Sequence, residues 1–321
     1  MKRIILLIVS VLVLVCSVMS IVGGKDTDNY IKYAEFNVTE DALQSAISYD
    51  INSQQEDIKL DYIEILAYLG AKYGGDFTKY KQSDMESFCQ QIKDGNSVDK
   101  ITKDMKYYTY YYNVYTAVLN GMVGAYEEEQ SDGSVRQDYG IRWFSPIAKT
   151  FPYSHYDDFG AQRTFGYTRP HLGHDLMSAV GTPVIAVESG TVECLGWNRY
   201  GGWRIGIRSN DSKRYWYYAH LRQNRPYAEG LKEGDTVTAG DVIGYVGRTG
   251  YSDTENINGI TESHLHIGLE LVFDESQKES DNEIWVNMYA LVSTLEQHKS
   301  STVRNSETKE FKRELLFKEI S

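Results

Sequence analysis

Two histidines one residue apart, His264 and His266, lie in a stretch where apolar and polar residues alternate, SHLHIGLE at residues 263–270. Such alternation is typical of a β-strand, in which side chains two positions apart point to the same face. The two imidazoles are therefore expected on one strand face. Paired imidazoles suit a metal ion, and such a site limits how the rest of the chain can fold around this strand.

A second group of candidate ligands lies upstream, in RPHLGHDLM at residues 169–177. If residues 171–176 are extended, His171, Gly173 and Asp175 share one face and His174 points away. Gly173 would then leave room for an ion between its neighbours. Zinc accepts histidine nitrogen and carboxylate oxygen, and catalytic zinc sites keep three protein ligands plus water. His171, Asp175 and one histidine of the downstream pair would supply that set.

The positions of the histidines favour reading the two groups together. Either motif alone arises often by chance. The chain has seven histidines, and six of them lie between residues 155 and 266. His220 is a further candidate, because it ends the strand-like run RYWYYAH at residues 214–220. His155, His174 and His298 are interpreted as structural.

The motifs resemble those of the lysostaphin-like, or LytM-type, zinc metallopeptidases, which cleave peptidoglycan cross-bridges or stem peptides. The family pattern is H-x-x-x-D, then a histidine in Y-x-H-L, then H-x-H. This chain has these motifs in that order at residues 171–175, 218–221 and 264–266. The resemblance covers roughly residues 140–290 and none of the first 125.

The resemblance implies a β-dominated catalytic domain, an antiparallel sheet or barrel of the duplicated hybrid motif type, that holds Zn²⁺. It implies His171, Asp175 and His266 as metal ligands and His220 and His264 as catalytic residues. His264 would take a proton from the attacking water or orient it. His220 would stabilise the oxyanion or protonate the leaving amine. The expected function is hydrolysis of peptide bonds in peptidoglycan, at stem-peptide cross-links or at a cross-bridge, by an extracytoplasmic cell-wall enzyme.

Two other functions are compatible with parts of the sequence. A catalytically inactive LytM-type scaffold that binds an envelope partner would lose ligands, whereas every motif position is filled here. Residues 231–243 resemble half of a biotinyl or lipoyl carrier motif, but no lysine occupies a matching modification turn. Both alternatives are therefore disfavoured relative to an active hydrolase.

Composition excludes one class of partner. The net charge of the 321-residue chain is -12, which argues against nucleic acid because phosphate binding needs a basic surface. The three cysteines do not make a disulfide framework, and Cys89 and Cys194 are interpreted as buried thiols.

The first residues predict a membrane anchor. Residues 4–22 are uncharged and follow Lys2 and Arg3, and as a helix they would span about 28 Å, close to the thickness of a bilayer core. We expect an uncleaved single-pass anchor over residues 1–25, with the catalytic domain outside the cytoplasm. A cleaved signal peptide, giving a secreted protein, is the competing interpretation.

The remaining chain is expected to be α+β. A helical domain at residues 26–126 would be followed by a linker at 127–139, the catalytic domain at 140–295 and a charged tail at 296–321 with a helix over 307–320. Helices are expected at residues 39–49 and 60–73, from a capping box at 83–86 to Gly95, and around a tyrosine-rich face at 108–122. That face is interpreted as core, or alternatively as a docking surface for an envelope protein.

Strands dominate the second half of the chain. Glycines at short intervals indicate tight turns between them. The long polar loop at residues 251–263 is expected to border the cleft, with a solvated insertion as the alternative. The expected strands cover residues 183–187, 191–195, 203–208, 214–220, 241–246 and 264–272.

Overall fold

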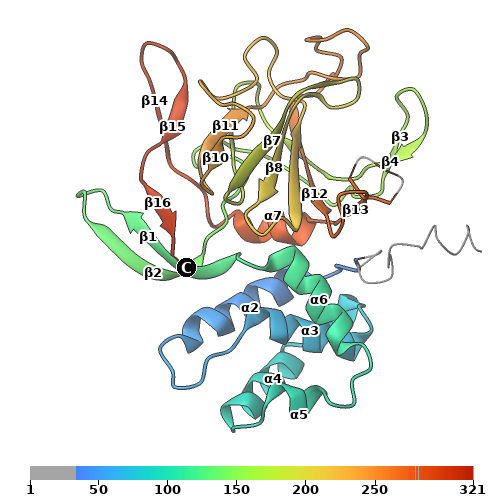
Figure 1. The fold of residues 1–321 in the computed structure, drawn as a ribbon, viewed down its shortest axis with the longest axis vertical. Helices are drawn as coiled ribbons and strands as arrows, with labels where there is room; N and C mark the ends of the chain where they lie inside the picture. Colours follow the sequence, from blue (N-terminus) through green and yellow to red (C-terminus); the bar gives the residue numbers. More distant parts are fainter. Residues whose placement is uncertain (1–33, 279, 281, 321) are drawn as a thin grey trace, which may run out of the picture. The chain divides into compact units, whose positions relative to one another are not determined.

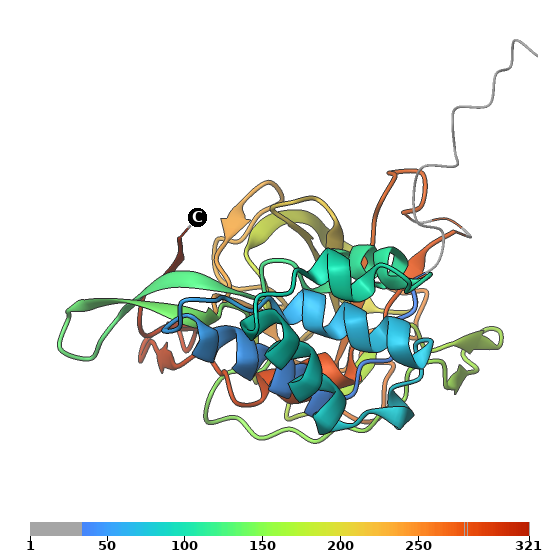
Figure 2. The same cartoon turned by 90° about the horizontal axis from the view of Figure 1, so that it is seen from below.

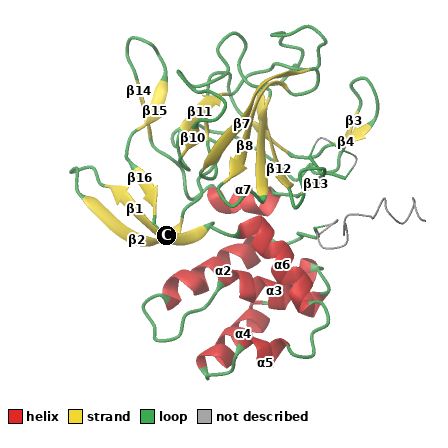
Figure 3. Ribbon diagram, viewed as in Figure 1, coloured by secondary structure: helices red, strands yellow, loops and turns green. Residues whose placement is uncertain are grey.

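The computed structural model describes residues 34–278, 280 and 282–320, drawn in colour in Figure 1. Contacts group Tyr33–Ser321 into one compact unit. Helices dominate its first part and antiparallel strands its second, as Figure 3 shows. The α+β class is confirmed at this level.

The predicted membrane location has to be corrected. Residues 1–25, over which the anchor was expected, lie outside the described residues. Within the described ranges, no helix is both long and apolar enough to cross a membrane. The structure therefore gives no span for a single-pass protein, and we do not assign one.

The four predicted helices are present in the predicted order, together with two short helices that were not predicted. Asp61 caps α3 through its carboxylate, which accepts from the amides of Ile63 and Glu64, and Gly74 ends this helix in the left-handed region at φ 63°. The prediction of a capping box at residues 83–86 is wrong, because α4 begins at Gln82 and its N-cap is Lys81. The helices are α2 (Glu40–Ser53), α3 (Tyr62–Tyr73), η2 (Phe77–Lys79), α4 (Gln82–Lys93), α5 (Val98–Thr102) and α6 (Tyr108–Leu119).

The tyrosine-rich face of α6 is mostly core. Tyr111 and Tyr115 are buried, and α6 packs along α3, as both Figure 1 and Figure 2 show. Tyr115 meets Phe36 edge to face, with ring centroids 5.6 Å apart. The packing supports the interpretation of this face as core, so it needs no partner to cover it.

The main sheet is antiparallel and has seven strands. Its order is β10-β7-β8-β9-β12-β13, and β5 also pairs with β12. Every predicted strand is present within a few residues. The strands of this sheet are β5 (His174–Met177), β7 (Gly190–Asn198), β8 (Gly202–Ser209), β9 (Arg214–Ala219), β10 (Thr236–Val237), β12 (His264–Leu271) and β13 (Ile284–Trp285). Two small sheets pair β6 (Pro183–Ile185) with β11 (Val242–Tyr245) and β3 (Gln162–Arg163) with β4 (Arg169–Pro170).

The segment predicted as a linker is a β-hairpin. β1 (Val123–Glu129) pairs with β2 (Val135–Ile141), and Gly133 lies at φ 81° in the connection. The charge run misled the prediction because its acidic residues lie in β1, the middle strand of the sheet β16-β1-β2, where Glu127 is opposite Lys318. Whether the chain divides into domains at this point stays a prediction.

The predicted helix in the tail is also wrong. The structure has the helix α7 (Tyr289–Leu295) and then three strands, β14 (Thr302–Arg304), β15 (Phe311–Arg313) and β16 (Phe317–Glu319). Phe317 is buried against Phe144, with ring centroids 5.1 Å apart, and near Tyr126 of β1. Burial of these aromatic rings outweighs the helix preference of the lysines and glutamates between them.

A buried ion pair joins the helical part to the sheet. Arg214 of β9 donates to both carboxylate oxygens of Glu188 and to the carbonyl oxygen of Ala117 in α6. Trp216 donates its indole N–H to the same carboxylate. Because these groups are buried, each depends on the others for its hydrogen bonds.

Candidate metal centre and cleft

Strand pairing brings the two histidine motifs together. β5 and β12 run antiparallel in a register that sets His266 opposite Asp175 and His264 opposite Met177. Side chains of directly opposed residues lie on the same face of a sheet. His171 lies three residues before β5 and folds back to the same place.

Three side-chain atoms form a compact triangle at this point. His171 Nε2 lies 3.1 Å from Asp175 Oδ1 and 2.8 Å from His266 Nδ1, and the latter two atoms are 3.0 Å apart. Two nitrogens and an oxygen bonded tetrahedrally to zinc at about 2.0–2.1 Å would be roughly 3.3 Å apart. These three residues therefore fit a zinc ion. Among the described residues, they form a group whose ligand atoms are spaced to hold a metal.

Gly173 makes room for a ligand rather than for the ion. A Cβ on this residue would come within 2.4 Å of Cε1 of His266 and 2.7 Å of the carbonyl oxygen of Ile267. The imidazole of His266 thus lies against the glycine. Any side chain at position 173 would push this ring out of the triangle.

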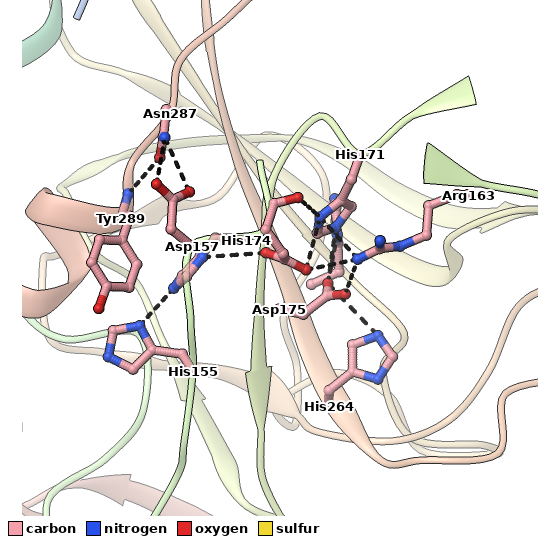
Figure 4. A network of polar contacts seen from close by, with 11 residues as sticks. His155, Asp157, Arg163, His171, His174, Asp175, His264, Asn287 and Tyr289 are labelled. Atoms are coloured by element: carbon pink, nitrogen blue, oxygen red, sulfur yellow. Dashed lines mark hydrogen bonds and ion pairs between the residues drawn. The ribbon is translucent and has the colours of Figure 1, made fainter. Parts of the chain in front are cut away.

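Two residues that the sequence did not single out hold the triangle in place. Asp158 Oδ2 lies 3.1 Å from Nδ1 of His171. Arg163 Nη2 donates to Oδ2 of Asp175 at 3.0 Å and to Asp158 at 2.7 Å. Figure 4 shows Arg163 and His171 converging on Asp175. Each contact fixes the ring or carboxylate so that its other polar atom faces the triangle.

His264 and His220 lie beside the triangle and present the same nitrogen to it. Nδ1 of His264 is 2.9 Å from the carbonyl oxygen of Glu262, and Nδ1 of His220 is 3.0 Å from that of Thr249. Because a carbonyl oxygen only accepts, both Nδ1 atoms carry the proton in these bonds and both Nε2 atoms keep a lone pair. The rings are 4.8 Å apart, and Nε2 of His264 is 3.7 Å from Oδ1 of Asp175.

His220 adopts an uncommon backbone conformation. Its φ is 60°, in the left-handed region that residues other than glycine and asparagine rarely occupy. Such strain costs on the order of 1 kcal/mol and persists where the surroundings impose it, often at functional sites. Here it turns the end of β9 so that the ring of His220 enters the cleft.

The other three histidines lie outside the group. Figure 4 shows His174 and Asp175 on opposite sides of β5, as strand alternation predicts. Nε2 of His174 is 2.7 Å from Nδ1 of His155. His298 bonds the carbonyl oxygen of Trp143 and stacks on Phe144.

The charges at the centre favour a cation. Burial works to raise the pKa of Asp175, but hydrogen bonds to His171 and His266 hold it far below the usual value. Burial works in the same direction on Asp158, and its contacts with His171 and His174 likewise lower its pKa. Both carboxylates are therefore ionised at neutral pH. Burial lowers the pKa of His220, which keeps its imidazole neutral.

The centre opens into a cleft of about 1090 Å³. Of the polar loop at residues 251–263, which was expected to border the cleft, only Tyr251 lines it. The wall carries both aromatic and charged groups, among them Arg169, Tyr200, Tyr217, Tyr251, Lys278 and Trp285. This size and mixture suit an extended peptide with polar groups.

Comparison with known proteins agrees with this geometry. Residues 169–304 match the model of peptidase family M23, so this segment is an M23 domain and the resemblance to LytM and lysostaphin is confirmed. M23 peptidases are zinc enzymes, which confirms the predicted cofactor for the domain. The roles of individual residues stay predictions.

Two relatives with named activities share part of the chain. The L-Ala–D-Glu endopeptidase of Bacillus subtilis is 42% identical over 124 residues, which cover 39% of this chain and 36% of that protein. Lysostaphin of Staphylococcus simulans is 40% identical over 98 residues, or 30% of this chain and 17% of that protein. The chain thus spans about a third or less of the length of these relatives.

One solved structure resembles most of the chain. A protein of Ruminococcus gnavus, assigned as a glycyl-glycine endopeptidase LytM, has a TM-score of 0.56 at 24% identity. The match covers 84% of this chain and 92% of that one. At this identity the likeness shows a shared fold, which includes the region outside the M23 domain.

Proposed function

We propose that this chain is a zinc endopeptidase that hydrolyses peptide bonds of bacterial peptidoglycan. The observation that carries the proposal is the triangle of His171 Nε2, Asp175 Oδ1 and His266 Nδ1 beside a cleft in an M23 domain. One of the two relatives, that of Bacillus subtilis, is an endopeptidase named for an L-Ala–D-Glu bond. A chain built only as a scaffold would have no need of a complete ligand set.

His171, Asp175 and His266 would hold the zinc. When bound, zinc polarises the scissile carbonyl and lowers the pKa of water toward about 7. Asp158 and Arg163 keep the ligands oriented, because each occupies the polar atom of a ligand that faces away from the triangle.

His264 and His220 would move protons. The attacking water loses a proton to Nε2 of His264, which lies 3.7 Å from Oδ1 of the ligand Asp175. His220 faces the same side of the cleft, 4.8 Å from His264 between ring centroids. The proton that the histidines take from the water is then delivered to the nitrogen of the leaving amine as the C–N bond breaks. No acid other than these two histidines is therefore needed.

The proposal also assigns catalysis to one segment of the chain. Residues 140–295 are the proposed catalytic segment. The tail packs on it through Phe317 and Phe144, and Arg214 of β9 bonds to α6. Experiments should therefore use the whole chain rather than a fragment.

The test is digestion of purified peptidoglycan by the zinc-loaded chain. Peptidoglycans with different cross-links are incubated with the protein, and the soluble fragments are identified by mass spectrometry. We expect new peptide termini at one type of bond, and chelation should abolish them. A zinc-bound protein that cleaves none of these substrates would support the scaffold function instead.

A further inference from the structure

The cleft wall next to the metal centre carries a preorganised cation, Arg169. Its Nη1 donates to the carbonyl oxygen of Phe165 at 3.1 Å, and its Nη2 reaches the hydroxyl of Tyr251 at 3.5 Å. The guanidinium carbon lies 4.5 Å from the ring centroid of Tyr200 and 5.5 Å from that of Tyr251. These contacts fix the group in place and leave other N–H donors for a ligand.

Arg169 differs from the other basic side chains of the cleft. Arg163 forms ion pairs with Asp158 and Asp175, and Lys278 forms one with Glu193. Arg204 also has an interaction partner. Arg169 forms no ion pair with any residue in the part of the chain that the structure describes. Its positive charge is therefore not balanced by a neighbouring carboxylate.

The position of Arg169 connects it to the proposed chemistry. It stands two residues before His171, in β4. Tyr251, which contacts the guanidinium, also lies 6.0 Å from His220 between ring centroids. A substrate group that meets Arg169 would therefore belong to a residue close to the scissile bond.

We propose that Arg169 binds a carboxylate on the peptide substrate, so that the cleft selects an anionic peptide over a neutral one. This inference rests on the proposed endopeptidase function. A guanidinium presents parallel N–H donors that match a carboxylate, and removal from water strengthens the pair. A glutamyl residue next to the cleaved bond carries such a carboxylate, whereas a chain of glycines carries none.

The test uses two synthetic peptides that differ in one group. Both contain alanine followed by a D-glutamyl residue, and in the second the free carboxylate of that residue is a carboxamide. We expect the zinc-loaded wild type to have a kcat/KM about tenfold or more higher for the carboxylate peptide, the scale of a charged hydrogen bond. Arg169→Gln should bring the ratio of the two kcat/KM values close to one, and Arg169→Lys should leave it intermediate.

A neighbouring arginine provides the matched control. Arg199 lies over the same Tyr200 ring, at 5.2 Å, but pairs with Asp253 and does not line the cleft. Arg199→Gln should keep the wild-type ratio. Equal kcat/KM values for both peptides in the wild type, or an unchanged ratio in Arg169→Gln, would overturn the inference.

A binding measurement separates this inference from the proposed function. Both peptides are titrated into the zinc-free full-length chain and its Arg169→Gln variant by calorimetry. Tighter binding of the carboxylate peptide, lost in the variant, would support Arg169 even if the wild type cleaved no substrate and the endopeptidase proposal failed. Equal dissociation constants in the wild type would count against Arg169 even if peptidoglycan were cleaved.

Discussion

The imidazole of His266 lies against Gly173, so closely that a Cβ at position 173 would be 2.4 Å from Cε1 of the ring. Position 173 therefore controls a metal ligand without being one.

We predict that Gly173→Ala weakens zinc binding while all three ligands remain. Overpacking of this kind costs about 1–3 kcal/mol, or roughly fivefold to a hundredfold in affinity. Chelator competition would measure the change. The control is Gly196→Ala, because a Cβ there meets nothing within 4 Å. Zinc affinity equal in the two variants would show that His266 does not depend on the space at Gly173.

Asp158→Asn should weaken zinc binding by about tenfold to a hundredfold, the usual effect of removing a carboxylate that orients a ligating histidine. The amide carries no charge to hold the Nδ1 proton of His171. Asp157→Asn is the matched control. Asp157 is the adjacent residue along the chain, but its carboxylate accepts hydrogen bonds from Asn287 (Figure 4). The same zinc affinity in both variants would contradict the orienting role of Asp158.

Parts of this site could be predicted from sequence and parts could not. Strand alternation places His264 and His266 on one face of β12, and the resemblance to the LytM pattern added the H-x-x-x-D pair His171 and Asp175, although His171 lies before β5 and not in an extended strand. Asp158 and Arg163 act through a short hairpin at residues 158–171, and neither belongs to a recognisable spacing. The glycines at 160 and 166, both with φ 77°, are local signals that this segment turns.

The same contrast holds for the fold. Strands flanked by glycine turns were predicted well, because each apolar run is buried in the sheet. The segment 127–139 and the tail were not. The tail depends on pairing between β16 and β1, which are almost 190 residues apart along the chain. Local charge pattern carries no information about such a partner. The Asp132–Gly133 dipeptide, typical of hairpin turns, was the overlooked signal.

Glu188→Ala should lower the free energy of unfolding by about 3–5 kcal/mol, because it removes both carboxylate oxygens that bind the buried Arg214 guanidinium and leaves only the partly exposed Asp211 beside it. Chemical denaturation would measure it. For comparison, Glu56→Ala removes an exposed pair with Lys93 and should cost at most about 1 kcal/mol. Similar losses in the two variants would mean that the Arg214 pair does not stabilise the fold as its burial suggests.

His298 should make stability sensitive to acid. Burial lowers its pKa in the folded chain. The unfolded chain, with a pKa of about 6.5, then binds the proton more readily, so stability is present above that pH and is lost as the pH falls below it. His298→Gln, which can still donate to Trp143, should lose less stability than the wild type between pH 7.5 and 5. Denaturation curves at both pH values would test this, and identical losses would exclude His298 as a cause.

The measurement that tests the central claim most directly is zinc content beside peptidoglycan hydrolysis in two variants of one strand, His264→Ala and His266→Ala. We expect His266→Ala to lose zinc and activity together, because it removes one corner of the ligand triangle. We expect His264→Ala to keep zinc near one ion per chain while hydrolysis falls by about a hundredfold or more. Loss of zinc from His264→Ala with retention in His266→Ala would contradict the assignment of ligand and base.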